Sequence, residues 1–296
     1  MSSLKEKLFK IPSERVALTS ETILMSYGDI KKMIKANSAK IEKLKSSNVV
    51  INGRDSFELA KLLFLLDGEV NSILFLPHDI DKSSKDIFLI DAKINYEVYL
   101  ENDYLHYKNI KDIDYKNSLK ETIWIIPTSG TTKIPKLVAH TFSSLTRTTK
   151  SDLESGNHYI WGLVFDIYRF SGIQVFLQAM LSGATLVINR SNMIMSEILN
   201  NLIKNNCNAL SGTPSFWRKV LMSKEINNLD FKIITMGGEI ADKNILQGLK
   251  LKFPNAKLLH IYASTEAGVG FSVKDAHAGF PKKYIDNGIN GLILKL

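Results

Sequence analysis

The sequence predicts an α/β fold with mostly parallel sheets flanked by helices, and three observations lead to this prediction. Short apolar stretches rich in β-branched residues alternate with helix-like stretches along most of the 296 residues. The segments between successive strands are long enough for a crossover helix, which a parallel pair of strands requires. The strands are apolar throughout, as expected for sheets that are covered on both faces.

The first half of the chain contains one β-α-β unit. Asn48 to Ile51 predicts a strand and Ser72 to Leu76 predicts the next one. Between them, Asp55 to Asp67 predicts a helix. Its first residue and Glu58 have the spacing of a capping box, and Gly68 marks its end.

Two other segments of the first half are less regular. Residues 78–120 are rich in Asp, Lys and Tyr, and within them Tyr96 to Tyr107 favours short paired strands in an exposed excursion. Six lysines between residues 31 and 45 form the densest part of the +8 net charge, and they are typical of the solvent-facing side of a helix. We divide the chain into a first α/β subdomain, residues 1–120, and a second, residues 121–296.

The second half repeats the alternation of strands and helices. The predicted strands are Thr122 to Ile126, Leu137 to Thr141, Tyr159 to Val164, Thr185 to Asn189, Asn208 to Leu210, Phe231 to Met236 and Lys257 to Tyr262. The predicted helices are Gly172 to Leu181, Ser196 to Asn205, Pro214 to Met222 and Asp242 to Phe253, with a further one that Ser143 or Ser144 could cap.

A polar loop follows the first strand of the second half. It reads Thr128, Ser129, Gly130, Thr131, Thr132, Lys133, Ile134, Pro135, Lys136. Its hydroxyls and glycine supply side-chain donors and backbone N–H groups that suit a polyphosphate, and Lys136 adds a positive charge. A Walker A loop is excluded, because it would place Gly before this lysine and Ser or Thr after it. A surface turn is the alternative interpretation of the composition.

This loop resembles the signature of the adenylate-forming superfamily, which includes acyl-CoA synthetases, luciferases and the adenylation domains of peptide synthetases. The family loop runs Ser/Thr-Ser-Gly-Ser/Thr-Thr-Gly-x-Pro-Lys, and the chain departs from it at Lys133. A second family segment, Tyr-Gly-x-Thr-Glu, is matched further along the chain with alanine in place of glycine. It reads Tyr262, Ala263, Ser264, Thr265, Glu266. Between the two matches lies the expected glycine pair, Gly237 and Gly238, followed by Glu239.

The resemblance implies a role for each matched residue. The loop from Thr128 to Thr132 would hold the β- and γ-phosphates of ATP together with Lys136, and Thr265 would touch the α-phosphate. Glu266 would carry Mg²⁺ and Tyr262 would stack on adenine, beside the glycine pair and the carboxylate that follows it. Without the family resemblance, Glu266 would be interpreted as a solvent-exposed carboxylate and Tyr262 as a core residue.

The implied reaction is the ATP-dependent activation of a carboxylic acid to an acyl-adenylate, followed by thioester formation with CoA or a carrier-protein thiol. Phe165 to Gly172 corresponds to the family segment that lines the acyl pocket. Arg169 could attract a substrate carboxylate there, or it could pair with Asp166. Large apolar residues nearby are interpreted as core packing and not as pocket walls, and they are Trp161, Phe176, Met180 and Trp217.

Members of this family continue into a Thr-Gly-Asp motif, a hinge and a small C-terminal domain with a catalytic lysine, and this sequence ends at Leu296 before all three. We therefore expect the N-terminal domain alone. It could be the large part of a longer ligase. It could also be a short chain that works with a separate C-terminal domain, or a nucleotide-binding or scaffold protein without turnover. The acid, the acceptor and the oligomeric state stay open at this stage.

The composition of the chain disfavours several other classes of protein. No apolar run approaches the ~18 residues of a membrane-spanning helix, and Met1 to Lys10 lacks the apolar segment of a signal peptide, so we expect a cytoplasmic protein with no membrane partner. Cys207 is the only cysteine, which excludes an intrachain disulfide and favours a buried thiol. A basic protein that binds nucleic acid is a third interpretation, but the lysine run carries no interleaved aromatic residues.

Overall fold

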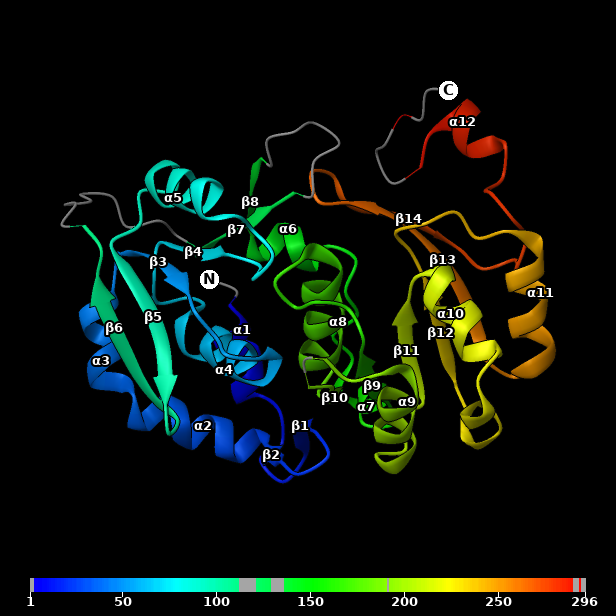
Figure 1. Cartoon of the computed structure of the whole chain (residues 1–296), viewed down its shortest axis with the longest axis horizontal. Coiled ribbons are helices and arrows are strands. Elements are labelled where there is room, and N and C mark those ends of the chain that lie inside the picture. The colour runs from blue at the N-terminus through cyan, green and yellow to red at the C-terminus, as the bar shows by residue number, and fades with distance from the viewer. Residues whose placement is uncertain (1–2, 112–120, 129–135, 191, 290–292, 294–296) are drawn as a thin grey trace.

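Two mostly parallel sheets, with helices between and around them, make up the computed structural model of the chain (Figure 1). The model describes residues 3–111, 121–128, 136–190, 192–289 and 293. One sheet has eight strands in the order β14-β13-β12-β11-β9-β10-β1-β2, and the other has six in the order β6-β5-β3-β4-β7-β8. The predicted α/β class with mostly parallel, helix-flanked sheets is therefore confirmed.

Parallel strands form the interior of both sheets, and antiparallel pairs lie at the edges. The eight-stranded sheet contains β1 (Val16–Thr19), β2 (Leu24–Ser26), β9 (Ile160–Leu163), β10 (Thr185–Ile188), β11 (Ala209–Gly212), β12 (Ile233–Met236), β13 (Lys257–Ser264) and β14 (Gly268–Val273). The six-stranded sheet contains β3 (Asn48–Ile51), β4 (Ser72–Phe75), β5 (Tyr96–Glu101), β6 (Tyr104–Asn109), β7 (Ile123–Pro127) and β8 (Leu137–Thr141).

The helices fill the crossovers between these strands. In the first half they are α1 (Leu4–Phe9), α2 (Tyr27–Ala36), α3 (Ser38–Leu44), α4 (Ser56–Leu66) and α5 (Lys82–Asp91). In the second half they are α6 (Phe142–Thr146), α7 (Leu153–Gly156), α8 (Phe170–Leu181), α9 (Met195–Lys204), α10 (Pro214–Leu221), the 3₁₀ helix η1 (Lys224–Asn228), α11 (Lys243–Lys252) and α12 (Lys283–Asn287). In the described part of the chain, no helix combines the length and the apolar character needed to cross a membrane.

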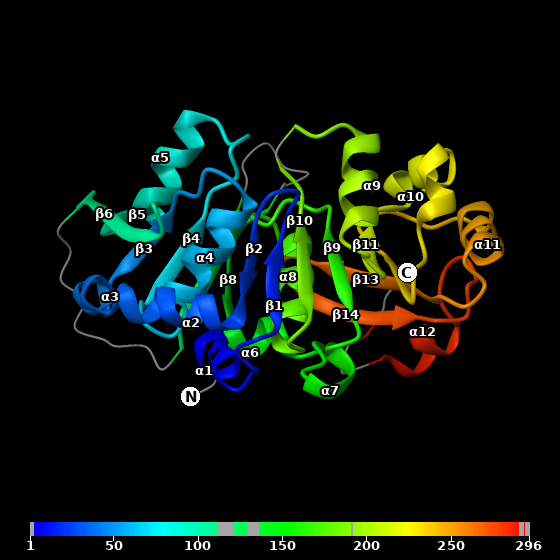
Figure 2. The ribbon, with the colours of Figure 1, turned by 90° about the horizontal axis from the view of Figure 1, so that it is seen from below.

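The two sheets exchange strands across the middle of the chain. Strands β7 and β8 follow residue 120 but belong to the sheet of β3–β6, whereas the N-terminal β1 and β2 join the sheet of the second half, beside β10 (Figure 2). The boundary between the two sheets along the chain therefore does not fall at residue 120. The division into subdomains at residues 1–120 and 121–296 stays a prediction.

Several local expectations need correction. The short helix after β8 is capped by Thr141, whose hydroxyl accepts from the Ser144 N–H at 3.0 Å, and not by Ser143 or Ser144. The run of lysines covers two helices, α2 and α3, where one was expected. Helix α5 was not predicted, because its charged sequence has weak helical periodicity, yet Asp81 caps it by accepting from the Ser84 N–H at 2.9 Å.

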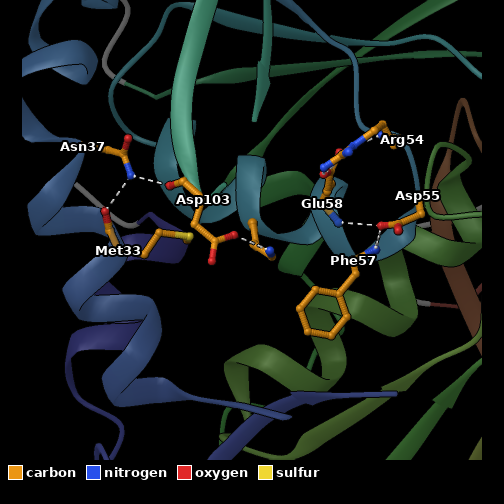
Figure 3. Close-up of polar contacts among 8 residues, drawn as sticks. Met33, Asn37, Arg54, Asp55, Phe57, Glu58 and Asp103 are labelled. Atoms are coloured by element: carbon orange, nitrogen blue, oxygen red, sulfur yellow. Dashed lines mark hydrogen bonds and ion pairs between the residues drawn. The ribbon is translucent and has the colours of Figure 1, made fainter. Parts of the chain in front are cut away.

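The segment from 96 to 107 forms the expected strand pair, here the β5–β6 hairpin. Its turn places Asn102 and Asp103 at positive φ, a conformation that these two residue types tolerate and that hairpin turns use. Asn37 attaches α2 to this turn, because its side-chain amide donates to the carbonyls of Met33 at 2.9 Å and Asp103 at 3.0 Å (Figure 3). The hairpin is thereby fixed against the helices.

Helix α4 begins and ends where the sequence predicted, within one residue. Asp55 accepts from the N–H groups of Phe57 and Glu58, both at 2.9 Å (Figure 3). The expected capping box is modified, since the Glu58 carboxylate accepts from the Arg54 N–H at 3.0 Å and pairs with the Arg54 guanidinium. Gly68 follows the helix at φ +83°, which explains glycine there.

The core lies between the sheets. Helices α4 and α8 are buried there, and the rings of Phe64 and Phe176 meet with centroids 5.4 Å apart. A second cluster lies on the other face of the eight-stranded sheet, under α9, α10 and α11, and includes Trp217. Cys207 is buried in this second cluster, as expected, and burial raises its pKa to about 12.

Asp67 is a buried carboxylate that joins the N-terminus to the six-stranded sheet. Its two oxygens accept from the Leu4 N–H and from Nε1 of Trp124, both at 2.7 Å. Burial raises the pKa of Asp67 to about 6, although these two hydrogen bonds oppose that shift. The carboxylate therefore binds its proton more tightly in the native state than in the unfolded chain.

We expect this pKa difference to appear in the pH dependence of stability. Between about pH 4 and pH 6 the native state holds more protons at Asp67 than the unfolded state, so the contribution of this residue to the free energy of unfolding falls as pH rises. Asp67→Asn removes this titration. Urea unfolding from pH 4 to 7 would show the stability of the variant, relative to wild type, rising by about 1–3 kcal/mol. Parallel pH profiles for the two proteins would contradict the assignment.

Candidate functional site

A cavity of about 1300 Å³ extends along one face of the eight-stranded sheet, from Tyr159 and Lys257 near the amino ends of β9 and β13 to the carboxyl ends of the parallel strands. Its wall includes Thr213 after β11, Gly237 after β12 and Ala263 at the end of β13. From the six-stranded sheet, Thr128 and Lys136 also line it. Open α/β sheets bind ligands at this edge. The cavity is therefore the candidate site, and it draws on both sheets.

The two ends of the phosphate-loop motif are joined to each other at this cavity. The Thr128 N–H donates to the Lys136 carbonyl at 2.8 Å, and the Lys136 N–H donates to the Thr128 hydroxyl at 3.3 Å. The side chain of Lys136 is exposed, whereas Thr128 is buried. The other predicted phosphate contacts lie outside the described residues, and they are Ser129, Gly130, Thr131 and Thr132.

The second motif forms the tip of the hairpin between β13 and β14. Ser264 faces Gly268 across the ladder, and the Ser264 hydroxyl accepts from the Ala267 N–H at 3.1 Å. Thr265 and Glu266 therefore lie in the turn itself, and both line the cavity with Ser264 and Ala263. Strand β13 is two residues longer than predicted, because it continues to Ser264. Glu266 is solvent-exposed at the tip.

His140 on β8 connects the two motifs. Its Nε2 lies 2.6 Å from the Thr265 carbonyl oxygen, and its Nδ1 lies 3.2 Å from the Ser144 hydroxyl. Because a carbonyl oxygen only accepts, Nε2 carries a proton. The ring is buried and packs 5.6 Å from the ring of Phe170. Sequence reasoning missed this residue, since a histidine in a predicted strand has no pattern that indicates a partner 125 residues away.

The predicted glycine pair lies at the cavity, directly after β12. Gly238 has φ +80°, a conformation that a side chain would strain. A Cβ atom on Gly237 would approach the backbone carbonyl of Ile261 to 3.3 Å. Both glycines line the cavity, so the conformation here keeps side chains out of its wall.

Two residues that the sequence predicts to contact the nucleotide make other contacts in the structure. The Glu239 carboxylate accepts from the Ser215 N–H at 2.9 Å and from its hydroxyl at 2.6 Å, and the bond from the hydroxyl is the main reason that the pKa of Glu239 is lowered. Tyr262 stacks on Phe271 with centroids 4.6 Å apart and meets the edge of Phe280. Neither Glu239 nor Tyr262 is among the residues that line the cavity. Their adenine contacts stay predictions.

Arg169 pairs mainly with Asp79 and not with Asp166, and it also lines the cavity, so its role toward a substrate carboxylate stays a prediction. Its guanidinium lies 2.6 and 2.7 Å from the two oxygens of Asp79, and only 3.8 Å from Asp166. Nearby, the Tyr168 hydroxyl donates to the Gly53 carbonyl and accepts from the Gly53 N–H. Burial raises the pKa of Tyr168 to about 12. The predicted acyl segment is thus attached to the loop after β3.

Trp161 is the one member of the predicted core set that also reaches the cavity. Met180, Phe176 and Trp217 are fully buried as expected. Trp161 packs in the same core as Phe176, but it also forms part of the cavity wall. Its interpretation as core packing alone was therefore wrong, because strand periodicity does not show which part of a covered face opens to a cavity.

The side chains of the cavity suit a metal ion that binds together with a nucleotide better than a metal ion held by the protein alone. Within the described ranges, no group of three or more His, Cys, Asp and Glu side chains could hold a metal ion. Glu266 is an exposed carboxylate in the cavity wall, which Asp152 and Asp275 also line. Mg²⁺ is commonly bound by one or two carboxylates together with substrate phosphates. These residues therefore fit a magnesium–nucleotide complex.

Comparison with known proteins identifies the family. The family model described as AMP-binding enzyme matches residues 60–287, which is more than half of the chain. The chain belongs to this family of adenylate-forming enzymes, and its fold is that of their N-terminal domain.

The structural neighbours share the fold at low sequence identity. The N-terminal subdomain of NpsA from Klebsiella oxytoca superposes with a TM-score of 0.74 at 16% identity, over 93% of this chain and 76% of that one. The unliganded O-succinylbenzoate coenzyme A synthetase MenE of Bacillus subtilis superposes with a TM-score of 0.69 at 14% identity, over 93% of this chain and 65% of that one.

Curated relatives are similar over part of the chain. A D-alanine--D-alanyl carrier protein ligase of Bacillus cereus (strain G9842) is 25% identical over 207 residues, which cover 65% of this chain and 41% of the relative. A protein of the same name from Staphylococcus aureus (strain bovine RF122 / ET3-1) is 30% identical over 161 residues, or 50% of this chain and 32% of the relative. The chain thus spans about two fifths or less of the length of these relatives.

We expect His140→Ala to cost about 1 kcal/mol of stability, because it removes the part-buried hydrogen bond to the Thr265 carbonyl. Affinity for Mg-ATP should fall at least tenfold as the hairpin tip loosens. His140→Gln retains an N–H donor and should recover part of both losses. Urea unfolding and titration calorimetry measure these two effects. Wild-type affinity in His140→Ala would show that the bond does not position the tip.

Proposed function

We propose that this chain carries the ATP and carboxylic-acid sites of an adenylate-forming ligase. The intact system would activate a carboxylic acid to its acyl-adenylate and then transfer the acyl group to a thiol. The observation that supports this most is that one cavity is lined by Lys136 from one sheet and by Thr265 and Glu266 from the other. This supports the proposal that the two motifs, which lie far apart in the sequence, act on one triphosphate.

The cavity residues suit the first half-reaction. Attack of the substrate carboxylate on the α-phosphate builds negative charge on the phosphoryl oxygens, and pyrophosphate leaves. Lys136 would neutralise the β- and γ-phosphates, and Thr265 would donate to the α-phosphate. Preorganised donors of this kind stabilise the transition state because they need no rearrangement during the reaction. Glu266 would hold Mg²⁺, which supplies further charge neutralisation when it is bound with ATP.

A carrier-protein thiol is the acceptor that we propose. The curated relatives are named as ligases of a carrier protein, and one structural neighbour is an artificially fused adenylation–PCP didomain, NpsA-ThdA from Klebsiella oxytoca. CoA is the alternative, since MenE is named as a coenzyme A synthetase. Because the chain spans about two fifths of the first of these relatives, we assign the thioester step to the remainder of a longer protein or to a separate domain.

A nucleotide-binding or scaffold homologue without turnover is the second candidate. It predicts binding of ATP without pyrophosphate exchange for any acid.

The nucleic-acid interpretation depends on the lysines of α2 and α3. Lys31 donates to the Ile11 carbonyl at 2.6 Å, and Lys45 pairs with Glu42 at 2.6 Å. These two side chains are thereby engaged within the chain. Binding to random DNA that weakens steeply with salt and ignores ATP would favour this interpretation.

ATP–pyrophosphate exchange across a panel of carboxylic acids tests the proposal. We expect exchange that depends on one class of acid, and a loss of roughly a hundredfold or more in Lys136→Ala and in Glu266→Ala, because each removes charge stabilisation from the transition state. Lys35→Ala, at an exposed lysine of α2, is the matched control and should behave as wild type. Exchange that survives the double variant at Lys136 and Glu266 would contradict the assigned site.

A further inference from the structure

Three polar side chains on the floor of the cavity have no role in phosphate binding. Trp161 on β9, Ser211 on β11 and Thr235 on β12 all line it. They share one face of the sheet, because the alternate residues, such as Leu210 and Ile234, belong to the core cluster on the other face. Ser211 and Thr235 are direct neighbours across the β11–β12 pair.

Two of these side chains contain buried polar atoms without a partner. Nε1 of Trp161 and the hydroxyl of Thr235 make no hydrogen bond with any group in the described part of the chain, and both side chains are only 6% exposed. The other two tryptophans are satisfied, since Nε1 of Trp124 donates to Asp67 at 2.7 Å and that of Trp217 donates to the Thr235 carbonyl at 3.0 Å. A buried polar group without a hydrogen bond is unfavourable, and native structures rarely retain one without a reason.

The surroundings of these groups are apolar. Ile233, Leu259, Ile261 and Val175 form the wall around them. A few polar groups within an apolar wall are typical of a site that recognises the orientation of a small molecule. Thr235 lies two residues before Gly237, about 7 Å back along β12 from the carboxyl edge. A group bound there would belong to the body of an acid whose carboxylate lies at that edge.

We propose that Trp161, Thr235 and Ser211 form a subsite for an oxygen acceptor on the body of the carboxylic acid, an inference that rests on the proposed function. The indole N–H only donates, so its partner must be an acceptor such as a hydroxyl, carbonyl or carboxylate oxygen. An ammonium group has no lone pair and is excluded from this position. The subsite therefore selects an oxygenated acid that is longer than a simple α-amino acid.

Binding of non-hydrolysable sulfonyl analogues of acyl-adenylates tests the subsite, because it needs no turnover. The probes are benzoyl against the 2-, 3- and 4-hydroxybenzoyl analogues, and hexanoyl against the 4- and 5-oxohexanoyl analogues. Titration calorimetry should show that at least one oxygenated probe binds tenfold or more tightly than its parent. Equal affinities within both series would overturn the proposal.

Two variants assign the preference to named atoms. Trp161→Phe removes the N–H and keeps a ring, and Thr235→Val removes the hydroxyl at similar volume. In each, the ratio of affinities between the preferred probe and its parent should fall at least fivefold. The unliganded variants should unfold at the wild-type temperature or above it, because an unsatisfied buried group has been removed. Trp124→Phe is the matched control, and it should unfold at a lower temperature because its N–H is bonded.

The outcomes separate this inference from the proposed function. If no probe binds, or if binding is unaffected by Thr265→Ala, the proposed function fails, because Thr265 is the residue assigned to the α-phosphate that the sulfonyl group replaces. If all probes bind in a way that depends on Thr265 but with equal affinity, only the subsite fails. A loss of stability in Thr235→Val or Trp161→Phe comparable to that in Trp124→Phe would also overturn the subsite, since these groups would then have partners within the fold.

Discussion

The hydrogen bond between His140 and the Thr265 carbonyl is the contact on which the arrangement of the site depends. It joins a strand of the six-stranded sheet to the hairpin tip of the eight-stranded sheet at 2.6 Å, beside the cavity that both sheets line. Without this bond the two motifs would be positioned by the packing of the sheets on α4 and α8 and by other polar contacts, such as the bond from Arg147 to the Val269 carbonyl. A directional bond fixes their spacing more closely than apolar packing does, because it weakens steeply when its geometry is lost.

The layers between the sheets make this contact possible. Helices α4 and α8 lie side by side in the core, and the Tyr168 hydroxyl and Arg169 attach the segment before α8 to the loops after β3 and β4. These polar contacts lie at the carboxyl edge, close to the cavity, whereas Asp67 fixes the N-terminal helix α1 to β7 elsewhere. The molecule therefore uses buried polar bonds to set the positions of elements, and apolar burial to hold them together.

The cavity combines an exposed, polar mouth with an apolar floor. Lys136 and Glu266 are exposed at the mouth, where charge can meet a solvated nucleotide, and Trp161 and Thr235 lie on the floor among apolar side chains. This gradient matches a reaction whose charged centre is the phosphate and whose specificity depends on the body of an acid. If the proposed subsite is correct, a ligand supplies the partner that Nε1 of Trp161 and the hydroxyl of Thr235 lack in the described part of the chain.

The sequence by itself determined the α/β class, most strands and helices of the second half, and the residues of the two motifs, because strand and helix periodicity, caps and loop composition are local properties. It did not reveal α5, the exchange of strands between the sheets, or the partners of Arg169, Glu239 and Tyr262. Those depend on contacts between residues distant in the chain, which no local pattern encodes. The bond from His140 and the position of Trp161 in the cavity wall were decided only by the tertiary structure, since both follow from how the two sheets pack.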